Sequence, residues 1–375
     1  MSKVFLNKID TYYVENLKEI YRKIFDELNI KDKIKKDSLV VIKPNLVIKS
    51  KPDSGIITHP SVVAAVGLLF KEMGAKILIA ESSGGLFTPS TCKMVFSGSG
   101  YTEMAEKYGF SLYLDAEYEK VVIKNPFICG ELSVIKPYIN PDFVVDIAKL
   151  KSHCMTGISG AVKNLFGVVP GLMKPELHCR FPEESDFVKM LTDVCRFVDP
   201  DLCIMDAIEG LEGDGPTGGV KRHMGFTAVS EDPYALDFVS AEIIGMKQSE
   251  VKMIKFWMDN NLAPTSLDEV DIIGNIDELR QKDFLMPRSK NTDMIERLPK
   301  FLRPVAKKIA TPKPVINSEK CVGCGKCAES CPQHTINLIN KKAVINYKNC
   351  IKCFCCHEMC PIHVIDIKRL KIFNL

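Results

Sequence analysis

The sequence has no long hydrophobic run. No uninterrupted apolar stretch of about 18 residues, the length that a membrane-spanning helix needs, occurs among its 375 residues. The N-terminal segment MSKVFLNKIDTYYVENLKEIY has acidic and polar side chains where a secretory signal requires an apolar core. We therefore expect no transmembrane segment and a cytoplasmic location.

The sequence also lacks a strong excess of charge of one sign. Its 50 Lys and Arg residues nearly balance 47 Asp and Glu residues, for a formal net charge of +3. This balance does not favour nucleic acid or a membrane surface as the partner. Two common nucleotide-binding patterns are missing as well, the G-x4-G-K-[ST] loop and a G-x-G-x-x-G turn that joins a strand to a helix. The G-x-G-x-x-G spacing does occur at residues 213–218, but no helical pattern follows it. ATP or NAD binding of those kinds is therefore disfavoured.

Apolar runs that end in Gly, Pro or polar clusters alternate with helical patterns over residues 1–280. Runs rich in Val and Ile without strict alternation indicate strands buried on both faces, as in a parallel sheet. Helices are predicted over 59–74 and 230–245, the second with Asp232 as N-cap and Pro233 in the first turn. The expected strands are 38–45, 75–85, 142–153, 201–210 and 269–275. We predict an α/β domain with an open, mostly parallel sheet and flanking helices.

The next segment, residues 281–315, is rich in proline and basic residues. We interpret it as a linker between two domains. Its piece ERLPKFLRPVAKKIA, residues 296–310, could pack on the protein itself, on a membrane surface or on an acidic partner.

Cysteine is abundant but unevenly placed. Six of the 15 cysteines are scattered over the first 320 residues and are expected to be buried free thiols. The remaining nine form two copies of C-x2-C-x2-C-x3-C-P with one cysteine left over. In this pattern three thiolates bind one [4Fe–4S] cube and the fourth binds the other cube. We therefore predict that residues 316–375 form a small α+β ferredoxin-like domain with two [4Fe–4S] clusters.

The interleaved order of the eight cysteines assigns them to two clusters. Zinc fits this order poorly, because zinc sites use four ligands in pairs. Cys355 is the cysteine left over, and it is either a packed thiol or an alternative or reactive ligand. The first predicted cluster has Cys321, Cys324, Cys327 and Cys360, and the second has Cys350, Cys353, Cys356 and Cys331.

Polar residues follow four of the predicted strands in the α/β domain. Ligands of open parallel sheets bind outside the carboxyl ends of the strands, so these residues indicate one shared site. The polar ends are Lys43-Pro44-Asn45, Glu81 to Gly85, Lys149-x-Lys151-x-His153, and Asp206 with Glu209.

The glycine-rich stretch 149–178 is the densest part of this predicted site. A helix expected to start near Ser159 would combine free N-terminal amides with Lys163, which favours an anionic ligand. His153 and His178 flank the loop as candidate proton donors or metal ligands, or as hydrogen-bonded structural residues. The candidate catalytic residues are His153, Lys163 and His178. The candidate residues for binding an anionic small-molecule cofactor are Lys43, Asn45, Lys151, Gly157, Gly160, Asn164, Glu212 and Asp214.

Glu212 and Asp214 lie among five glycines in EGLEGDGPTGG, residues 209–219. Their carboxylates could bind a divalent cation through oxygen. A tight acidic turn without a ligand is the alternative.

Several motifs resemble those of a known family, the domain of unknown function 362 family. They are KPNLV (43–47), THP (58–60), KLKSH (149–153), TGISGAVKNLFGVVPG (156–171), His178, DAIEGLEGDGPTGG (206–219) and DPYALD (232–237). The resemblance covers nearly the whole chain and implies an iron–sulfur protein, since many members carry a two-cluster ferredoxin tail. The Lys-x-His and T-G-x-S-G patterns are also distantly similar to the lactate racemase family. That similarity implies a nickel-pincer nucleotide addressed by His153 and Lys163.

Together these features favour a redox protein that passes single electrons to a substrate or cofactor bound at the strand ends. A redox partner protein or a small-molecule substrate would then be its partner. Two alternatives remain open at this point. One is a dedicated electron carrier that docks to a partner enzyme, and the other is a protein of cluster or metal assembly, or of sensing.

Overall fold

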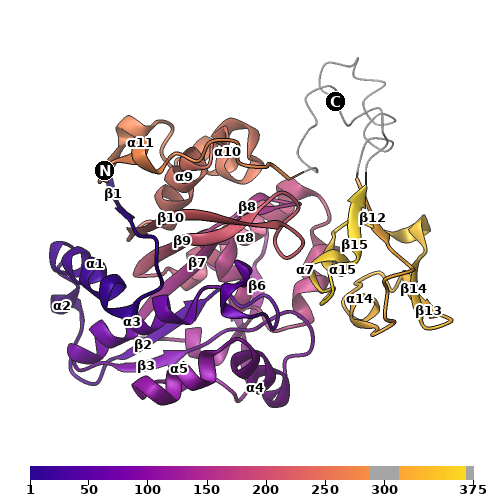
Figure 1. Cartoon of the computed structure of the whole chain (residues 1–375), viewed down its shortest axis with the longest axis horizontal. Coiled ribbons are helices and arrows are strands. Elements are labelled where there is room, and N and C mark those ends of the chain that lie inside the picture. Colours follow the sequence, from indigo (N-terminus) through magenta and orange to yellow (C-terminus); the bar gives the residue numbers. More distant parts are fainter. Residues whose placement is uncertain (288–311, 369–375) are drawn as a thin grey trace.

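The computed structural model describes residues 1–287 and 312–368 (Figure 1). Most of the predicted linker, including residues 296–310, lies outside the described residues. Within the described residues, no helix is long and apolar enough to cross a membrane.

A nine-stranded sheet forms the centre of the described α/β domain, in the order β11-β1-β10-β9-β7-β2-β3-β4, with β8 paired to β7. The run from β9 to β4 is parallel, whereas β10 is antiparallel to both β9 and β1. The sheet is therefore mostly parallel, as predicted. Its strands are β1 (Ser2–Lys8), β2 (Leu39–Pro44), β3 (Lys76–Ile79), β4 (Ser111–Leu112), β7 (Phe143–His153), β8 (Gly157–Ser159), β9 (Leu202–Glu212), β10 (Val220–Ser230) and β11 (Val270–Ile273).

Helices cover both faces of this sheet. On β2, Val41 packs into one apolar core and Val40 and Ile42 into the other, because successive side chains of a strand point to opposite faces. The first core includes α6 (Ala161–Asn164), α8 (Glu184–Val198), α9 (Pro233–Ile243) and α10 (Lys252–Asp259). The second includes α1 (Val14–Glu27), α3 (Pro60–Glu72), α4 (Pro89–Gly98) and α5 (Tyr101–Tyr108).

Smaller elements complete the α/β domain. The predicted helix start at Asp232 is confirmed, since its carboxylate accepts hydrogen bonds from Tyr234 N and Ala235 N at the start of α9. The remaining elements are α2 (Ile30–Lys33), α7 (Met173–Arg180), α11 (Ile276–Leu279) and the antiparallel pair β5 (Tyr118–Val122) and β6 (Glu131–Ile135).

The C-terminal module is a separate small unit beside α7 (Figure 1). It begins with β12 (Lys313–Ile316), which pairs antiparallel with β15 (Ile365–Lys368). Between them lie α14 (Lys326–Glu329), the hairpin of β13 (Ile336–Ile339) and β14 (Lys342–Ile345), and α15 (Cys355–Glu358). The module therefore has the expected small α+β form.

Side-chain contacts join the module to the α/β domain. Thr217 Oγ1 donates to the Glu358 carbonyl at 3.1 Å, and His357 Nε2 lies 3.0 Å from the Asp214 carbonyl. A methyl group at Gly84 would come within 2.3 Å of Met359 Sδ, so the backbone of the α/β domain and the module approach closely there. The loop around α15 is thus embedded in the α/β domain.

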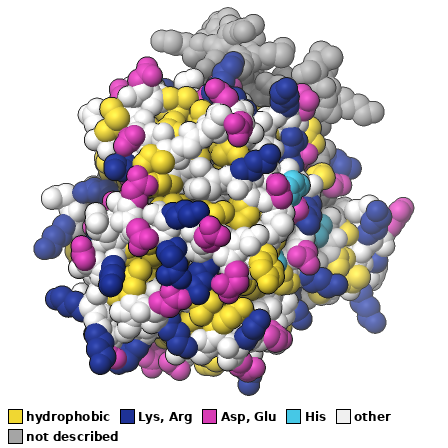
Figure 2. Space-filling view, turned by 60° about the vertical axis from the view of Figure 1, so that its left-hand side comes forward, with side chains coloured by type: hydrophobic (Ala, Val, Ile, Leu, Met, Phe, Trp, Pro, Cys, Tyr) yellow, Lys and Arg dark blue, Asp and Glu magenta, His cyan; other side chains and the backbone are white. Residues whose placement is uncertain are grey.

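On the face shown in Figure 2, Lys and Arg side chains are interspersed with Asp and Glu. This mixture agrees with the small net charge of the chain.

Candidate cluster sites and a pocket between the two domains

The eight cysteines of the repeated pattern surround two cavities. Cys321, Cys324, Cys327 and Cys360 line a cavity of about 320 Å³. Cys331, Cys350, Cys353 and Cys356 line another of about 330 Å³. The structure therefore brings the cysteines together in the two sets expected from their spacing.

Backbone amides point at the sulfur atoms in these cavities. Thr335 N donates to Cys331 Sγ and Val364 N to Cys360 Sγ, each at 3.4 Å. Such N–H groups stabilise thiolates that bind an iron–sulfur cluster. In a cube each thiolate binds a different iron, so the four sulfurs are spread apart. Accordingly, no three His, Cys, Asp or Glu residues in the described ranges lie close enough to hold a single metal ion.

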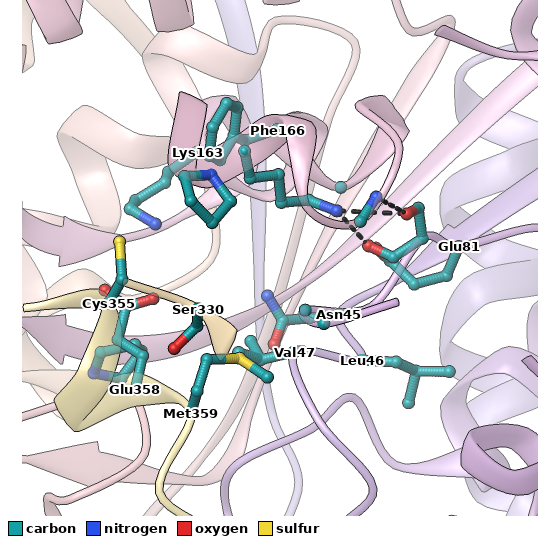
Figure 3. A pocket seen from close by; sticks show the side chains of 18 of the residues that line it. Asn45, Leu46, Val47, Glu81, Lys163, Phe166, Ser330, Cys355, Glu358 and Met359 are labelled. Atoms are coloured by element: carbon teal, nitrogen blue, oxygen red, sulfur yellow. Dashed lines mark hydrogen bonds between the residues drawn. The ribbon is translucent and has the colours of Figure 1, made fainter. Parts of the chain in front are cut away.

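A pocket of about 740 Å³ lies between the module and the α/β domain (Figure 3). Its floor includes Asn45 after β2 and Glu81 after β3, which places it at the carboxyl ends of the parallel strands. The module completes its wall. The module residues that line it are Ser330, Cys355, Glu358 and Met359.

A buried polar network supports the floor of the pocket. Lys43 Nζ donates to Glu81 Oε2 at 2.5 Å, and Asn45 Nδ2 to Asn164 Oδ1 at 2.8 Å. Lys151 Nζ donates to Asn45 Oδ1 at 2.8 Å. Four predicted binding residues thus lie together, but the charge of Lys43 is already neutralised by Glu81.

Two further lysines of the pocket wall have no carboxylate within ion-pair distance among the described residues. Lys163 forms no hydrogen bond with any described residue, and burial lowers its pKa. Lys174 donates to the Ser82 carbonyl and, at 3.2 Å, to Ser82 Oγ. Burial lowers the pKa of Lys174 from 10.5 to about 7. Sequence reasoning missed Lys174, although it lies four residues before His178 in the glycine-rich stretch.

His153 connects the α/β domain to the module. Its Nδ1 accepts hydrogen bonds from Met155 N and Thr156 N, at 3.1 and 3.3 Å, so the proton of the neutral ring is on Nε2. Nε2 lies 3.2 Å from Glu358 Oε1. Burial and the charge of Lys163 lower the pKa of His153 to about 3, so the ring is neutral at pH 7. Burial alone would raise the pKa of Glu358, but His153 and Lys163 keep it below its usual value.

His178 lines the pocket, whereas His153 is not among the lining residues. Its ring stacks on Phe187, with ring centres 4.2 Å apart, and burial lowers its pKa to about 4. Its Nδ1 is buried and has no hydrogen-bond partner among the described residues. An unpartnered buried nitrogen in a pocket wall is costly unless a ligand or water binds it.

Other predicted site residues are used differently. The amides of Ala161 and Val162, expected to bind a ligand anion, instead donate to Asp237 at 2.6 and 3.1 Å. Gly160 is needed there because a side-chain carbon would lie 2.0 Å from the Asp237 carboxylate. Gly157 lies in β8 with φ +87°, a conformation that suits glycine.

The carboxylates of the acidic turn and of the fourth strand end do not line the pocket, although Pro216 of the turn does. Glu212 forms an ion pair with Arg222 at 2.7 Å, and Asp214 contacts the module through its carbonyl oxygen. Asp206 forms an ion pair with Lys149 at 2.9 Å and bonds to Tyr12. The strand ends therefore form two separate buried networks rather than one site.

Two parts of this chain match known protein families. Residues 40–242 match the family described as a domain of unknown function (DUF362), and residues 313–361 match a 4Fe–4S dicluster domain. A thylakoid-associated protein of Synechocystis is 30% identical over 255 residues, which cover 68% of this chain and 78% of that protein.

Among solved structures, the lactate racemase apoprotein of Thermoanaerobacterium thermosaccharolyticum aligns with a TM-score of 0.41 and 15% identity. The alignment covers 67% of this chain but only 58% of the racemase chain. The nickel-pincer nucleotide implied by that resemblance stays a prediction. The two family matches, by contrast, are decisive: the chain belongs to the DUF362 family and carries a C-terminal 4Fe–4S dicluster domain.

Proposed function

We propose that this chain is an iron–sulfur redox protein that reduces or oxidises an anionic small molecule held between its two domains. The observation that carries this proposal is the shared pocket, because its wall is built from both the α/β domain and the cysteine-rich module. A carrier that only exchanged electrons with a partner would not need a polar pocket at this boundary.

The eight cysteines are the residues that would hold the clusters, in the two sets that line the two cavities. When bound, [4Fe–4S] clusters supply or accept single electrons. Ser330 and Cys355 of the pocket wall are sequence neighbours of Cys331 and Cys356, both of the second set. The second set is therefore the one closer along the chain to the pocket.

The charges of the pocket favour an anionic ligand. Glu81 neutralises Lys43, and Glu358 lies against the neutral His153. Lys163 and Lys174 remain as positive groups without a carboxylate at ion-pair distance in the described part of the chain. A carboxylate, sulfonate or phosphate between them would offset the cost of burying two like charges.

Two histidines can hold or move a proton at the pocket. His153 is neutral, and its Nε2 lies 3.2 Å from Glu358 Oε1 without forming a hydrogen bond to a described residue. His178 is neutral at pH 7, and its unpartnered Nδ1 can accept from or donate to a ligand according to its tautomer.

A redox partner would reach the first set of cysteines more easily than the second. Cys324 is exposed, as is Val322 beside it, with 65% of its surface accessible. This exposure keeps the electron-carrier function as a second candidate, in which a partner protein docks at the first loop.

Small molecules released from anaerobically purified protein provide the test. We expect mass spectrometry to find an anionic ligand in the wild type and little in Lys163→Ala. Lys326→Ala removes an exposed lysine of the module and serves as the control. Both variants should keep the wild-type iron content, and equal ligand retention in all three proteins would contradict the proposal.

A further inference from the structure

Cys355 is the cysteine that the repeated cluster pattern does not use. It lies between Cys353 and Cys356 of the second set, yet it lines the pocket rather than the cluster cavity. The equivalent position in the first loop is Lys326, which is exposed, whereas Cys355 has only 6% of its surface accessible. The second loop therefore presents a thiol to the pocket.

The groups around this thiol are those of a binding site. In Figure 3 the Lys163 and Cys355 side chains point toward one another across the pocket. Nearby, the buried Nδ1 of His178 has no partner in the described part of the chain. This nitrogen points, independently of the cysteine, to a ligand or water in the same pocket.

We propose that Cys355 is a redox-active thiol that forms a mixed disulfide with the ligand, and that the substrates of the pocket are disulfides of small anionic thiols. The inference rests on the proposed function, which it deepens by naming the substrate class. Lys163 would bind the anionic group of the thiol that is transferred to Cys355.

The reaction balances in two steps. First, Cys355–SH attacks RS–SR, so that a Cys355–S–SR bond forms, the original S–S bond breaks and RSH leaves with the proton. Second, two electrons and two protons cleave Cys355–S–SR to Cys355–SH and a second RSH. The two clusters, reduced beforehand by a low-potential one-electron donor, would supply one electron each. Two single-electron donors thus match one two-electron bond.

The loop that carries Cys355 keeps the backbone of the first loop but not its side chains. The residue before it, Phe354, has φ +63°, a left-handed conformation that is unfavourable for a bulky side chain. The first loop has Gly325 at this place, with φ +81°. The second loop therefore keeps its cluster-binding geometry while replacing Gly-Lys by Phe-Cys.

The first experiment uses anaerobic, cluster-loaded, oxidised protein and two small probe disulfides. Dithiodiglycolate is a dianion, and cystamine is a dication. Peptide mass spectrometry should find a thioglycolate adduct on Cys355, formed about tenfold faster or more than the cystamine adduct. Lys163→Ala should remove most of this preference for the anion.

Variants separate Cys355 from the other thiols. Cys355→Ser and Cys355→Ala should keep the wild-type iron content but lose the adduct. Cys179→Ser, which removes a half-buried thiol outside the pocket wall, should behave as the wild type. An adduct that forms elsewhere at the same rate in Cys355→Ser would overturn the inference.

The second experiment follows electrons from dithionite-reduced, desalted protein. Each dithiodiglycolate should take two electrons and yield two thioglycolates, and Cys355→Ser should slow this reaction about tenfold or more. A variant as fast as the wild type would overturn the role of Cys355. A pocket ligand without sulfur, retained through Lys163, would overturn this inference while the proposed function stands. If Lys163→Ala kept both the bound ligand and the wild-type rate of dithiodiglycolate reduction, the inference and the proposed function would both be contradicted.

Discussion

The two cysteine loops of the module share a pattern but face different surroundings. In both loops, a residue with left-handed backbone conformation directly precedes a short helix, α14 in the first loop and α15 in the second. In the first loop Cys324, Lys326 and Glu329 are exposed. In the second, the equivalents of the last two are Cys355, which is buried, and Glu358, which contacts His153. One loop thus faces solvent and the other faces a pocket.

This difference shows that a few residues can give the two loops of a symmetric electron-transfer module different roles, one facing solvent and the other facing a pocket. Cluster ligation constrains the cysteines and the left-handed position in both loops. The residues between the ligands are free to vary, and only the second loop has acquired groups that complete a site on another domain. The following changes, applied to both loops, test this comparison.

Loss of one ligand per loop should have the largest effect. Cys324→Ser and Cys353→Ser are each expected to lower iron from about eight to about four atoms per chain. Because cluster binding is coupled to folding, Cys353→Ser should also disorder the pocket wall and release the bound ligand, whereas Cys324→Ser should retain it. Iron analysis and ligand quantification on the same samples provide the measurement. Iron near eight in either variant would show that the assignment of ligands is incorrect.

Removal of the acid at the end of each short helix should have a smaller effect. Glu358→Gln removes the carboxylate beside His153, whose negative charge also acts on the buried Lys163 from beyond ion-pair distance, so we expect the free energy of unfolding to fall by about 2 kcal/mol. Glu329→Gln changes an exposed side chain and should cost less than about 0.5 kcal/mol. Anaerobic urea denaturation measures both. Equal stability of the two variants would argue that Glu358 does not hold the module in place.

The smallest expected effect is on the pH dependence of ligand binding, which should change when a lysine of the pocket wall is replaced but not when a lysine of the exposed first loop is replaced. The pKa of Lys174 is about 7, so its amine is charged below that pH and neutral above it. Affinity for an anion should therefore be highest below pH 7 and fall by up to about tenfold per pH unit above it. Titration of dithiodiglycolate binding between pH 6 and pH 9 measures this. In Lys174→Met the affinity should be lower at pH 6 and the decline above pH 7 should largely disappear, while Lys326→Met should keep the wild-type profile.

The fold was largely predictable because its central strands are continuous apolar runs. β2, β3, β7, β9 and β11 all fall within the predicted ranges, apart from the last two residues of β9. β1 and β10 were missed because β10 has the charged residues Lys221 and Arg222 near its start and β1 has polar residues at both ends. Their antiparallel pairing depends on contacts more than 200 residues apart, which no local pattern encodes.

The site was only partly predictable. Lys43, Asn45, Lys151 and Asn164 lie together as strand-end polarity suggested, because parallel strands end at the same edge. The use of Asp237 to cap α6 could not be foreseen, since it lies 76 residues from the amide of Ala161. The contribution of Glu358 arises from docking of the module. The extra Cys355 marked this loop as unusual in the sequence, but its spacing did not indicate contact with the α/β domain.

The pairing of β12 with β15 brings the entry and exit of the cysteine-rich module side by side. A module whose first and last strands pair with each other can fold as a unit and be exchanged between genes as a cassette. Here, however, a transplanted ferredoxin would restore electron supply but not the pocket, unless its second loop also carried the thiol and the carboxylate. An exchanged module would thus have to keep the pocket-facing residues of α15, whereas the exposed residues of α14 could vary.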